Sequence, residues 1–153
     1  MKVAVATDHG GYPLKETVIT ALRELGHEPI DFGAESMESV DYPDFAKIAG
    51  EAVAKGEADR AILLCGSGVG VCITANKIPG VYACVCHDSY TAYQGVEHDQ
   101  MNALCLGGRV IGTELAIVIV KSFMSARFSG VPRHERRVEK MKAIEKKQLK
   151  GLL

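Results

Sequence analysis

Residues 61–70 read AILLCGSGVG, and this stretch decides the fold class. Its first four residues form a short apolar run of the length of a buried strand, which ends at Cys65. Three glycines then alternate with other residues, and a short helical pattern continues towards Asn76. A buried strand that passes through a glycine turn into a helix is typical of a parallel sheet covered by helices on both faces.

The same alternation of strand and helix runs through the rest of the chain. Apolar runs of strand length are found at 3–6, 29–32, 61–64, 81–85 and 103–106. Apolar residues at helical spacing are found between Pro13 and Gly26, after Gly70, and over 43–55, 115–123 and 134–149. The order predicts an α/β protein, a three-layer α/β/α sandwich around a five-stranded parallel Rossmann-like sheet. In such a sheet ligands bind beyond the carboxyl ends of the strands, so the chemistry is expected in loops 7–11, 65–70 and 88–102.

Composition and charge exclude several classes of protein. The 153 residues suit one domain, 1–153, and 47% of them are hydrophobic, which is too many for a disordered chain. With a net charge of −1, the chain has no overall positive electrostatic field of the kind that non-specific nucleic-acid binding requires. No apolar run reaches the roughly 18 residues of a membrane span, and residues 1–7 are too short for a signal peptide. We therefore expect a cytoplasmic protein that binds neither membranes nor nucleic acid.

The five cysteines fit a reducing compartment. They are odd in number and never spaced C-x-x-C, which argues against a disulfide framework or a four-cysteine zinc site. Four of them are expected to be small buried hydrophobic residues. Cys65 is the exception because it stands at the entrance of the glycine loop.

The glycine loop predicts an anion site next to a reactive thiol. Alternating glycines let successive backbone N–H groups point at one place, and the same field favours the thiolate form of Cys65. This arrangement suits acyl transfer, phosphate chemistry, or proton removal beside a carbonyl with stabilisation of the enolate. Three familiar motifs do not match. The loop lacks the Lys and Ser/Thr that a P-loop requires. Val71 stands at the position where the dinucleotide-binding motif requires glycine and where the loop of a cysteine phosphatase requires arginine.

Three further polar groups are candidates, each with a simpler structural interpretation. Asp8 and His9 follow the first strand and can bind sugar or anions, or Asp8 can merely cap a helix. His98–Asn102 precedes the fifth strand and can equally be a surface loop. Residues 133–150 carry a local net charge of +5, and such a basic helix is usually just a solvent-exposed face. Arg133 and Arg137, however, lie four residues apart on one side of the helix and can both bind one phosphate.

Together these pieces resemble the type B ribose-5-phosphate isomerases, the family that also includes allose-6-phosphate and galactose-6-phosphate isomerases. The resemblance runs from Val3 to about Ile144. It is carried by segments 8–11, 41–43, 65–70, 75–77 and 108–110, by His98 with Asn102, and by Arg133-His134 with Arg137. Several motifs in the correct order are more specific than one glycine loop. The resemblance implies interconversion of an aldose phosphate and its ketose through a cis-enediolate, without a metal or other cofactor, in the pentose phosphate pathway.

The resemblance also implies roles for individual residues. Cys65 would move the proton between C2 and C1, Ser67 would assist, and His98 would help to open the furanose ring. The enediolate oxygen would be held by the amides of Gly66, Gly68 and Gly70. The phosphate would be bound by His9, Arg109, Arg133 and Arg137, and the sugar by Asp8 and Tyr42.

One catalytic position departs from the family. Asp99 stands where the family usually has asparagine, and its charge would repel an enediolate. A glutamate that serves as the base in some members is here Val71, which favours Cys65.

Family members are dimers or tetramers with shared sites, so we expect a homodimer or homotetramer. The basic helix at about 133–149 would pack on the partner, with an apolar stripe of Val138, Met141 and Ile144. Two alternatives stay open. The substrate can be another sugar, such as allose 6-phosphate, galactose 6-phosphate or an unphosphorylated aldose. The chain can also be a non-catalytic binder of phosphosugars or nucleotides.

Overall fold

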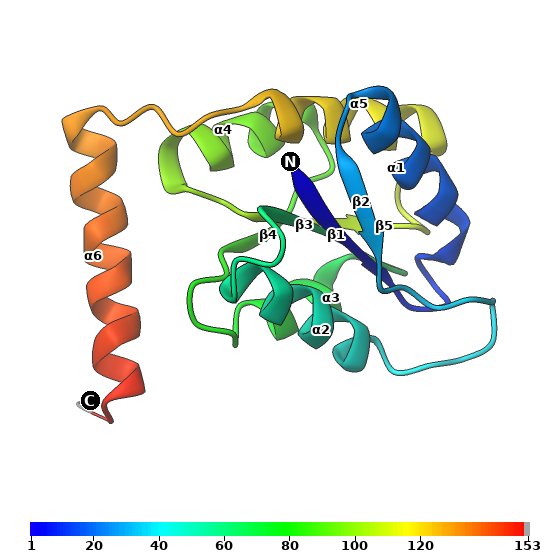
Figure 1. Cartoon of the computed structure of the whole chain (residues 1–153), viewed down its shortest axis with the longest axis horizontal. Helices are drawn as coiled ribbons and strands as arrows, with labels where there is room; N and C mark the ends of the chain where they lie inside the picture. Colours follow the sequence, from blue (N-terminus) through cyan, green and yellow to red (C-terminus); the bar gives the residue numbers. More distant parts are fainter. Residues whose placement is uncertain (152–153) are drawn as a thin grey trace.

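The computed structural model describes residues 1–151, and the last two residues of the expected 1–153 domain lie outside this part. Five parallel strands form one sheet in the order β2-β1-β3-β5-β4 (Figure 1). The strands are β1 (Lys2–Thr7), β2 (Glu28–Asp31), β3 (Arg60–Cys65), β4 (Ala83–Val85) and β5 (Ala103–Gly107). The helices are α1 (Tyr12–Glu24), α2 (Tyr42–Ala54), α3 (Val69–Ala75), α4 (Ser89–Asp99), α5 (Thr113–Ser125) and α6 (Pro132–Leu149). The predicted α/β fold is confirmed.

Two helical layers cover the sheet. Helices α1, α4 and α5 lie on one face, and α2 and α3 lie on the other (Figure 1). In β3, Ile62 and Leu64 enter the first core, whereas Leu63 and Cys65 enter the second. Because both faces of the central strands are buried, their sequences are apolar throughout and do not alternate.

Residues 89–99 form helix α4, which corrects the prediction of a continuous loop over 88–102. Its exposed face is polar and only Ala92 and Val96 are buried, so the helical apolar pattern is faint in the sequence. The side chain of Asp88 starts the helix, because its Oδ1 accepts a hydrogen bond of 2.7 Å from the Thr91 amide.

Helix α4 carries the chain back to the amino edge of the sheet, the edge where the strands begin. Asn102, just before β5, accepts a hydrogen bond from the amide of Ala61 near the start of β3. His98 and Asp99 therefore lie at the amino edge, not at the carboxyl edge where the loop prediction placed them.

Strand β4 is shorter than the predicted 81–85 because asparagine side chains replace part of its ladder. Asn102 Oδ1 accepts a hydrogen bond from the Tyr82 amide at 2.8 Å, and Asn76 Oδ1 accepts one from the Ala83 amide at 2.9 Å.

Strand β2 covers 28–31 in place of the predicted 29–32, a difference of one residue at each end. Its neighbour β1 sets this register, with Lys2 opposite Glu28.

Helix α6 stands to one side of the three layers (Figure 1). It packs mainly against α4, and Val138 is buried within the chain itself, which corrects its place in the apolar stripe. Met141 and Ile144 remain exposed. Among the helices of residues 1–151, none is both long and apolar enough to cross a membrane.

Arg60 joins the sheet to the end of α5. Its buried guanidinium donates hydrogen bonds to the carbonyl of Phe123 and, at 2.8 Å, to the carbonyl of Ala126. The guanidinium also lies 5.0 Å from the centre of the Phe123 ring.

We expect Arg60→Met to lower the free energy of unfolding by about 2–3 kcal/mol, because buried carbonyls lose a charged donor. Urea unfolding measures this loss. Arg23→Met, at an exposed position of α1, should change stability by less than about 0.5 kcal/mol, and an equal effect of both variants would contradict the assignment.

Candidate active site

Three glycine-bearing turns meet at the carboxyl edge, after the adjacent strands β1, β3 and β5. A methyl group added to Gly10 would lie 2.8 Å from the Gly66 nitrogen, and one added to Gly108 would lie 2.6 Å from the Gly10 oxygen. The Gly108 amide also donates to the Cys65 carbonyl at 2.8 Å. The turns therefore pack backbone against backbone, and Gly68 adopts the left-handed conformation with φ of 80°.

These turns enclose a cavity of about 380 Å³, which we call the Cys65 hollow. It is lined by Asp8, Tyr42, Cys65, Gly66, Ser67, Gly70, Arg109 and Val110. Seven of these eight residues were predicted from the sequence. Val110 and Gly108 belong to segment 108–110, which carries the family resemblance, but neither was predicted as a site residue. Gly107 was not singled out, although two glycines at the end of an apolar strand are a visible signal.

Cys65 lines this hollow and also borders the second core. Only 5% of the residue is exposed, and its Sγ accepts a hydrogen bond of 3.0 Å from the Gly68 amide. A backbone donor aimed at sulfur stabilises negative charge there. The cysteine is therefore shielded from bulk water yet open to a ligand in the hollow.

The other cysteines lie elsewhere. Cys86 and Cys105 are buried as expected, but Cys72 is half-buried and Cys84 is exposed on the edge strand β4, which corrects the prediction for these two. A hydrogen bond from Cys105 lowers the pKa of Cys72 to about 7, while burial raises the pKa of Cys105. Neither residue lines the Cys65 hollow, so an ionisable thiol at position 72 faces no ligand cavity at this edge.

Tyr42 and Arg109 lie against glycines of the loop, but only Gly70 is required to leave room for its neighbour, because a methyl group on Gly66 would make an ordinary contact. A methyl group on Gly70 would lie 2.7 Å from the Tyr42 ring, and one on Gly66 would lie 3.5 Å from the Arg109 guanidinium. The Arg109 amide donates to the Gly66 carbonyl at 3.0 Å, which sets the position of its backbone. Tyr42 and Arg109 thus cover the glycine loop from two sides.

Asp8 holds the turn before α1 but does not cap the helix, because the N-cap is Gly11 and the cap makes no side-chain hydrogen bond. Its Oδ1 accepts hydrogen bonds from the amides of Gly10 at 2.8 Å and Gly11 at 2.9 Å, and the residue also lines the hollow. The second carboxylate oxygen is therefore the one left for a ligand. His9 is half-buried beside it, and its Nδ1 accepts from the Val40 amide at 3.2 Å.

A second group of polar side chains, here called the α4–α6 cluster, consists of His98, His134, Arg133 and Arg137. The rings of His98 and His134 lie 4.0 Å apart between centroids. His98 Nε2 lies 3.1 Å from Glu97 Oε2, and His134 Nδ1 lies 2.6 Å from Ser129 Oγ. Burial lowers the pKa of His134, and the positive charges beside it act in the same direction. His134 was not among the predicted site residues, although it adjoins Arg133 in the sequence.

Within one chain, the α4–α6 cluster does not join the Cys65 hollow. His98 lies at the amino edge of the sheet, and the exposed Arg133 and Arg137 project from α6. Asp99 lines a different, mainly apolar cavity of about 370 Å³ together with Cys84, Met101 and Met141. Asp99 therefore lies away from the Cys65 hollow of its own chain.

Comparison with known proteins identifies the family. The model of the ribose/galactose isomerase family matches residues 3–141. The chain belongs to this family. A member from Escherichia coli (strain K12), ribose-5-phosphate isomerase B, is 44% identical over 147 residues, covering 96% of this chain and 98% of that protein.

Solved structures of family members agree with the fold. Ribose-5-phosphate isomerase B of Clostridium thermocellum superposes with a TM-score of 0.93 and 49% identity, covering 97% of this chain and 99% of that one. The enzyme of Mycoplasma genitalium, solved with bound ribulose-5-phosphate, gives a TM-score of 0.89 at 38% identity, covering 95% and 96% of the two chains.

Proposed function

We propose that this protein is an aldose–ketose isomerase that interconverts ribose 5-phosphate and ribulose 5-phosphate through a cis-enediolate. The observation that carries the proposal is Cys65 in the lining of a 380 Å³ hollow, with a backbone donor 3.0 Å from its sulfur and Arg109 beside the glycine loop. Membership of the ribose/galactose isomerase family and the names of its relatives support the same reaction.

The chemistry follows from the positions of sulfur and backbone amides. The Cys65 thiolate takes the proton from C2 of the open-chain aldose, and the electron pair moves onto the C1 oxygen, which gives the cis-enediolate. The hydroxyl proton on O2 passes to O1, and the thiol returns its proton to C1. This leaves the ketose and regenerates the thiolate. Because a sugar α-proton is a weak acid, donors must hold the developing oxyanion. The amides of Gly66 and Gly70, assisted by Ser67, take this role, while the Gly68 amide donates to the Cys65 sulfur.

The sugar and its phosphate occupy the rest of the hollow. The free oxygen of Asp8 and the Tyr42 hydroxyl contact the sugar hydroxyls. Arg109 binds the phosphate together with His9, which follows Asp8 in the chain but does not itself line the hollow. Binding energy from the phosphate holds the open chain in reactive geometry, although the phosphate itself does not react.

We further propose that a second copy of the chain completes each site. His98, Asp99, Arg133 and Arg137 lie on α4 and α6, away from the Cys65 hollow of their own chain. Helix α6 stands outside the three layers (Figure 1). Its residues Met141 and Ile144 are exposed, as are most of its basic residues. In a homodimer or homotetramer this helix, at about 133–149 of the single domain, packs on the partner. Helix α6 delivers the two arginines to the phosphate, and α4 delivers His98 to the ring oxygen.

A panel of aldoses tests the reaction and the substrate. We expect ribose 5-phosphate to give the highest kcat/KM, and unphosphorylated ribose to fall at least about a hundredfold below it, because three arginines lose their dianionic partner. The rate of ketose formation measures this order. A higher value for allose 6-phosphate or galactose 6-phosphate would move the assignment to a six-carbon sugar. Tight calorimetric binding of all these phosphates without any turnover would make the protein a binder and refute the proposed reaction.

A further inference from the structure

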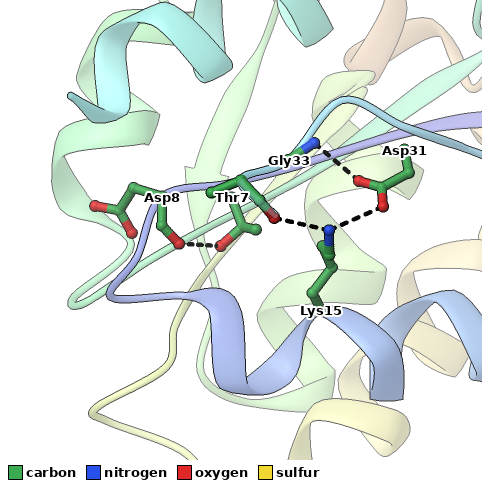
Figure 2. Close-up of polar contacts among 6 residues, drawn as sticks. Thr7, Asp8, Lys15, Asp31 and Gly33 are labelled. Atoms are coloured by element: carbon green, nitrogen blue, oxygen red, sulfur yellow. Dashed lines mark hydrogen bonds and ion pairs between the residues drawn. The ribbon is translucent and has the colours of Figure 1, made fainter. Parts of the chain in front are cut away.

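Lys15 in α1 is an unusually well-shielded lysine with no part in the chemistry above. Only 14% of its side chain is exposed, whereas the lysines of other ion pairs, such as Lys47, are exposed by 66%. Its ammonium lies 3.0 Å from Asp31 Oδ2 and donates to the Ala34 carbonyl at 2.8 Å. Figure 2 shows Lys15 reaching from α1 to Asp31, while the Asp8 carboxylate points away from this contact. A lysine held this way normally serves a specific partner, since burial is costly for an unpaired ammonium.

These contacts fasten the beginning of the segment that joins β2 to α2. The Gly33 amide donates to Asp31 Oδ1 at 2.8 Å (Figure 2), and the Ala34 amide donates to the Thr7 carbonyl at 2.9 Å. A methyl group on Gly33 would lie 2.7 Å from Thr7 Cγ2. Residues 31–34 therefore lie directly against the end of β1, immediately before Asp8.

The far end of the same segment reaches the proposed substrate site. The Val40 amide donates to His9 Nδ1, and Tyr42, which begins α2, lines the Cys65 hollow. A backbone amide can only donate, so Nδ1 of His9 must carry a lone pair and the ring proton must be on Nε2. His9 is thereby prepared as a donor through Nε2, the atom that remains for a ligand oxygen.

We propose that Lys15 and Asp31 are positioning residues for substrate binding. Through segment 32–41 they hold His9 as the Nε2–H tautomer and keep Tyr42 in place over Gly70. The inference rests on the proposed function of the Cys65 hollow. Cys65 itself is anchored independently, by the amides of Gly68 and Gly108, so the loss of Lys15 affects binding more than the chemical step.

The test compares Lys15→Met and Asp31→Asn with Lys47→Met, which removes an exposed lysine of α2. For the first two variants we expect KM for ribose 5-phosphate to rise about tenfold, because a charged hydrogen bond is lost. We expect kcat to change by less than about threefold, since only interactions common to ground state and transition state are weakened. Lys47→Met should leave both constants unchanged. Equal KM values for all three variants and the unmodified protein would overturn the proposal.

A second measurement does not depend on catalysis. Long-range ¹H–¹⁵N correlation spectra report the tautomer of each histidine, and His9→Gln identifies the signal of His9. We expect the Nε2–H tautomer in the unmodified protein and a mixture of tautomers in Lys15→Met. An Nδ1–H tautomer in the unmodified protein, or an unaltered His9 signal in Lys15→Met, would overturn the inference. If the unmodified protein isomerises no sugar phosphate, the proposed function fails, while the tautomer still decides the role of Lys15.

Discussion

Replacing Cys65 with alanine is expected to lower kcat for ribose 5-phosphate by about 10³–10⁴-fold, with little change in KM. The expected loss corresponds to that of a general base, which typically contributes 10²–10⁴-fold, together with the stabilising contact that its thiolate makes in the hollow. The Cys65 side chain is small and the phosphate contacts lie elsewhere, so substrate still binds. Uptake of deuterium at C2 from heavy water, followed by NMR, measures the proton transfer directly.

Two other cysteines provide controls for this experiment. Cys84→Ala alters an exposed thiol on the edge strand, and Cys72→Ala removes the thiol whose pKa is lowered to about 7. Neither residue lines the Cys65 hollow, so both variants should keep activity within a few-fold of the unmodified protein. Normal C2 exchange in Cys65→Ala would refute the cysteine mechanism. If Cys72→Ala lost as much activity as Cys65→Ala, the assignment of Cys65 as the only sulfur that acts as the base would be wrong.

Mixing two inactive variants is expected to restore activity. Cys65→Ala damages the hollow of its own chain, whereas His98→Ala damages the contribution that the chain makes to its partner. Each variant alone should lose at least about a hundredfold in activity. After subunit exchange, half of the dimers are mixed, and each mixed dimer contains one site with both Cys65 and His98 intact. The mixture should therefore recover about a quarter of the unmodified activity.

The matched control for this complementation uses two residues of the same hollow. Cys65→Ala mixed with Ser67→Ala leaves every site with one damaged residue, because both side chains come from one chain. That mixture should recover no activity. Recovery in the control, or none in the mixture with His98→Ala, would mean that His98 does not act across the subunit boundary.

Local patterns were sufficient to predict the sheet and the position of the Cys65 hollow. Apolar strands that end in glycine turns indicate a parallel sheet, and the carboxyl edge then follows from the direction of the chain. Asp8, Cys65 and Arg109 belong to different turns, yet β1, β3 and β5 are neighbours in the sheet. Strand ends that point the same way bring Asp8 and Cys65 together as this pattern predicts, whereas Arg109 was expected only from the family resemblance.

Helix α4 shows where local patterns were insufficient. Its polar face and two buried residues leave a weak signal, so residues 88–102 resemble a loop in the sequence. A loop would have kept His98 and Asp99 at the carboxyl edge, but an eleven-residue helix carries them to the opposite edge. The same limitation applies to Val138, because periodicity identifies an apolar residue but not the surface that covers it.

The amino-acid sequence by itself determined the α/β class, the glycine turn at Cys65 and the family resemblance, because these depend on neighbours in the chain. Only the tertiary structure decided which residues share a cavity, that Tyr42 lies over Gly70, and that Lys15 reaches Asp31 and Ala34. It also separated the α4–α6 cluster from the Cys65 hollow. The physical reason is that strand and helix signals arise from local spacing, whereas a cavity is formed by side chains that only the packing of distant segments brings together.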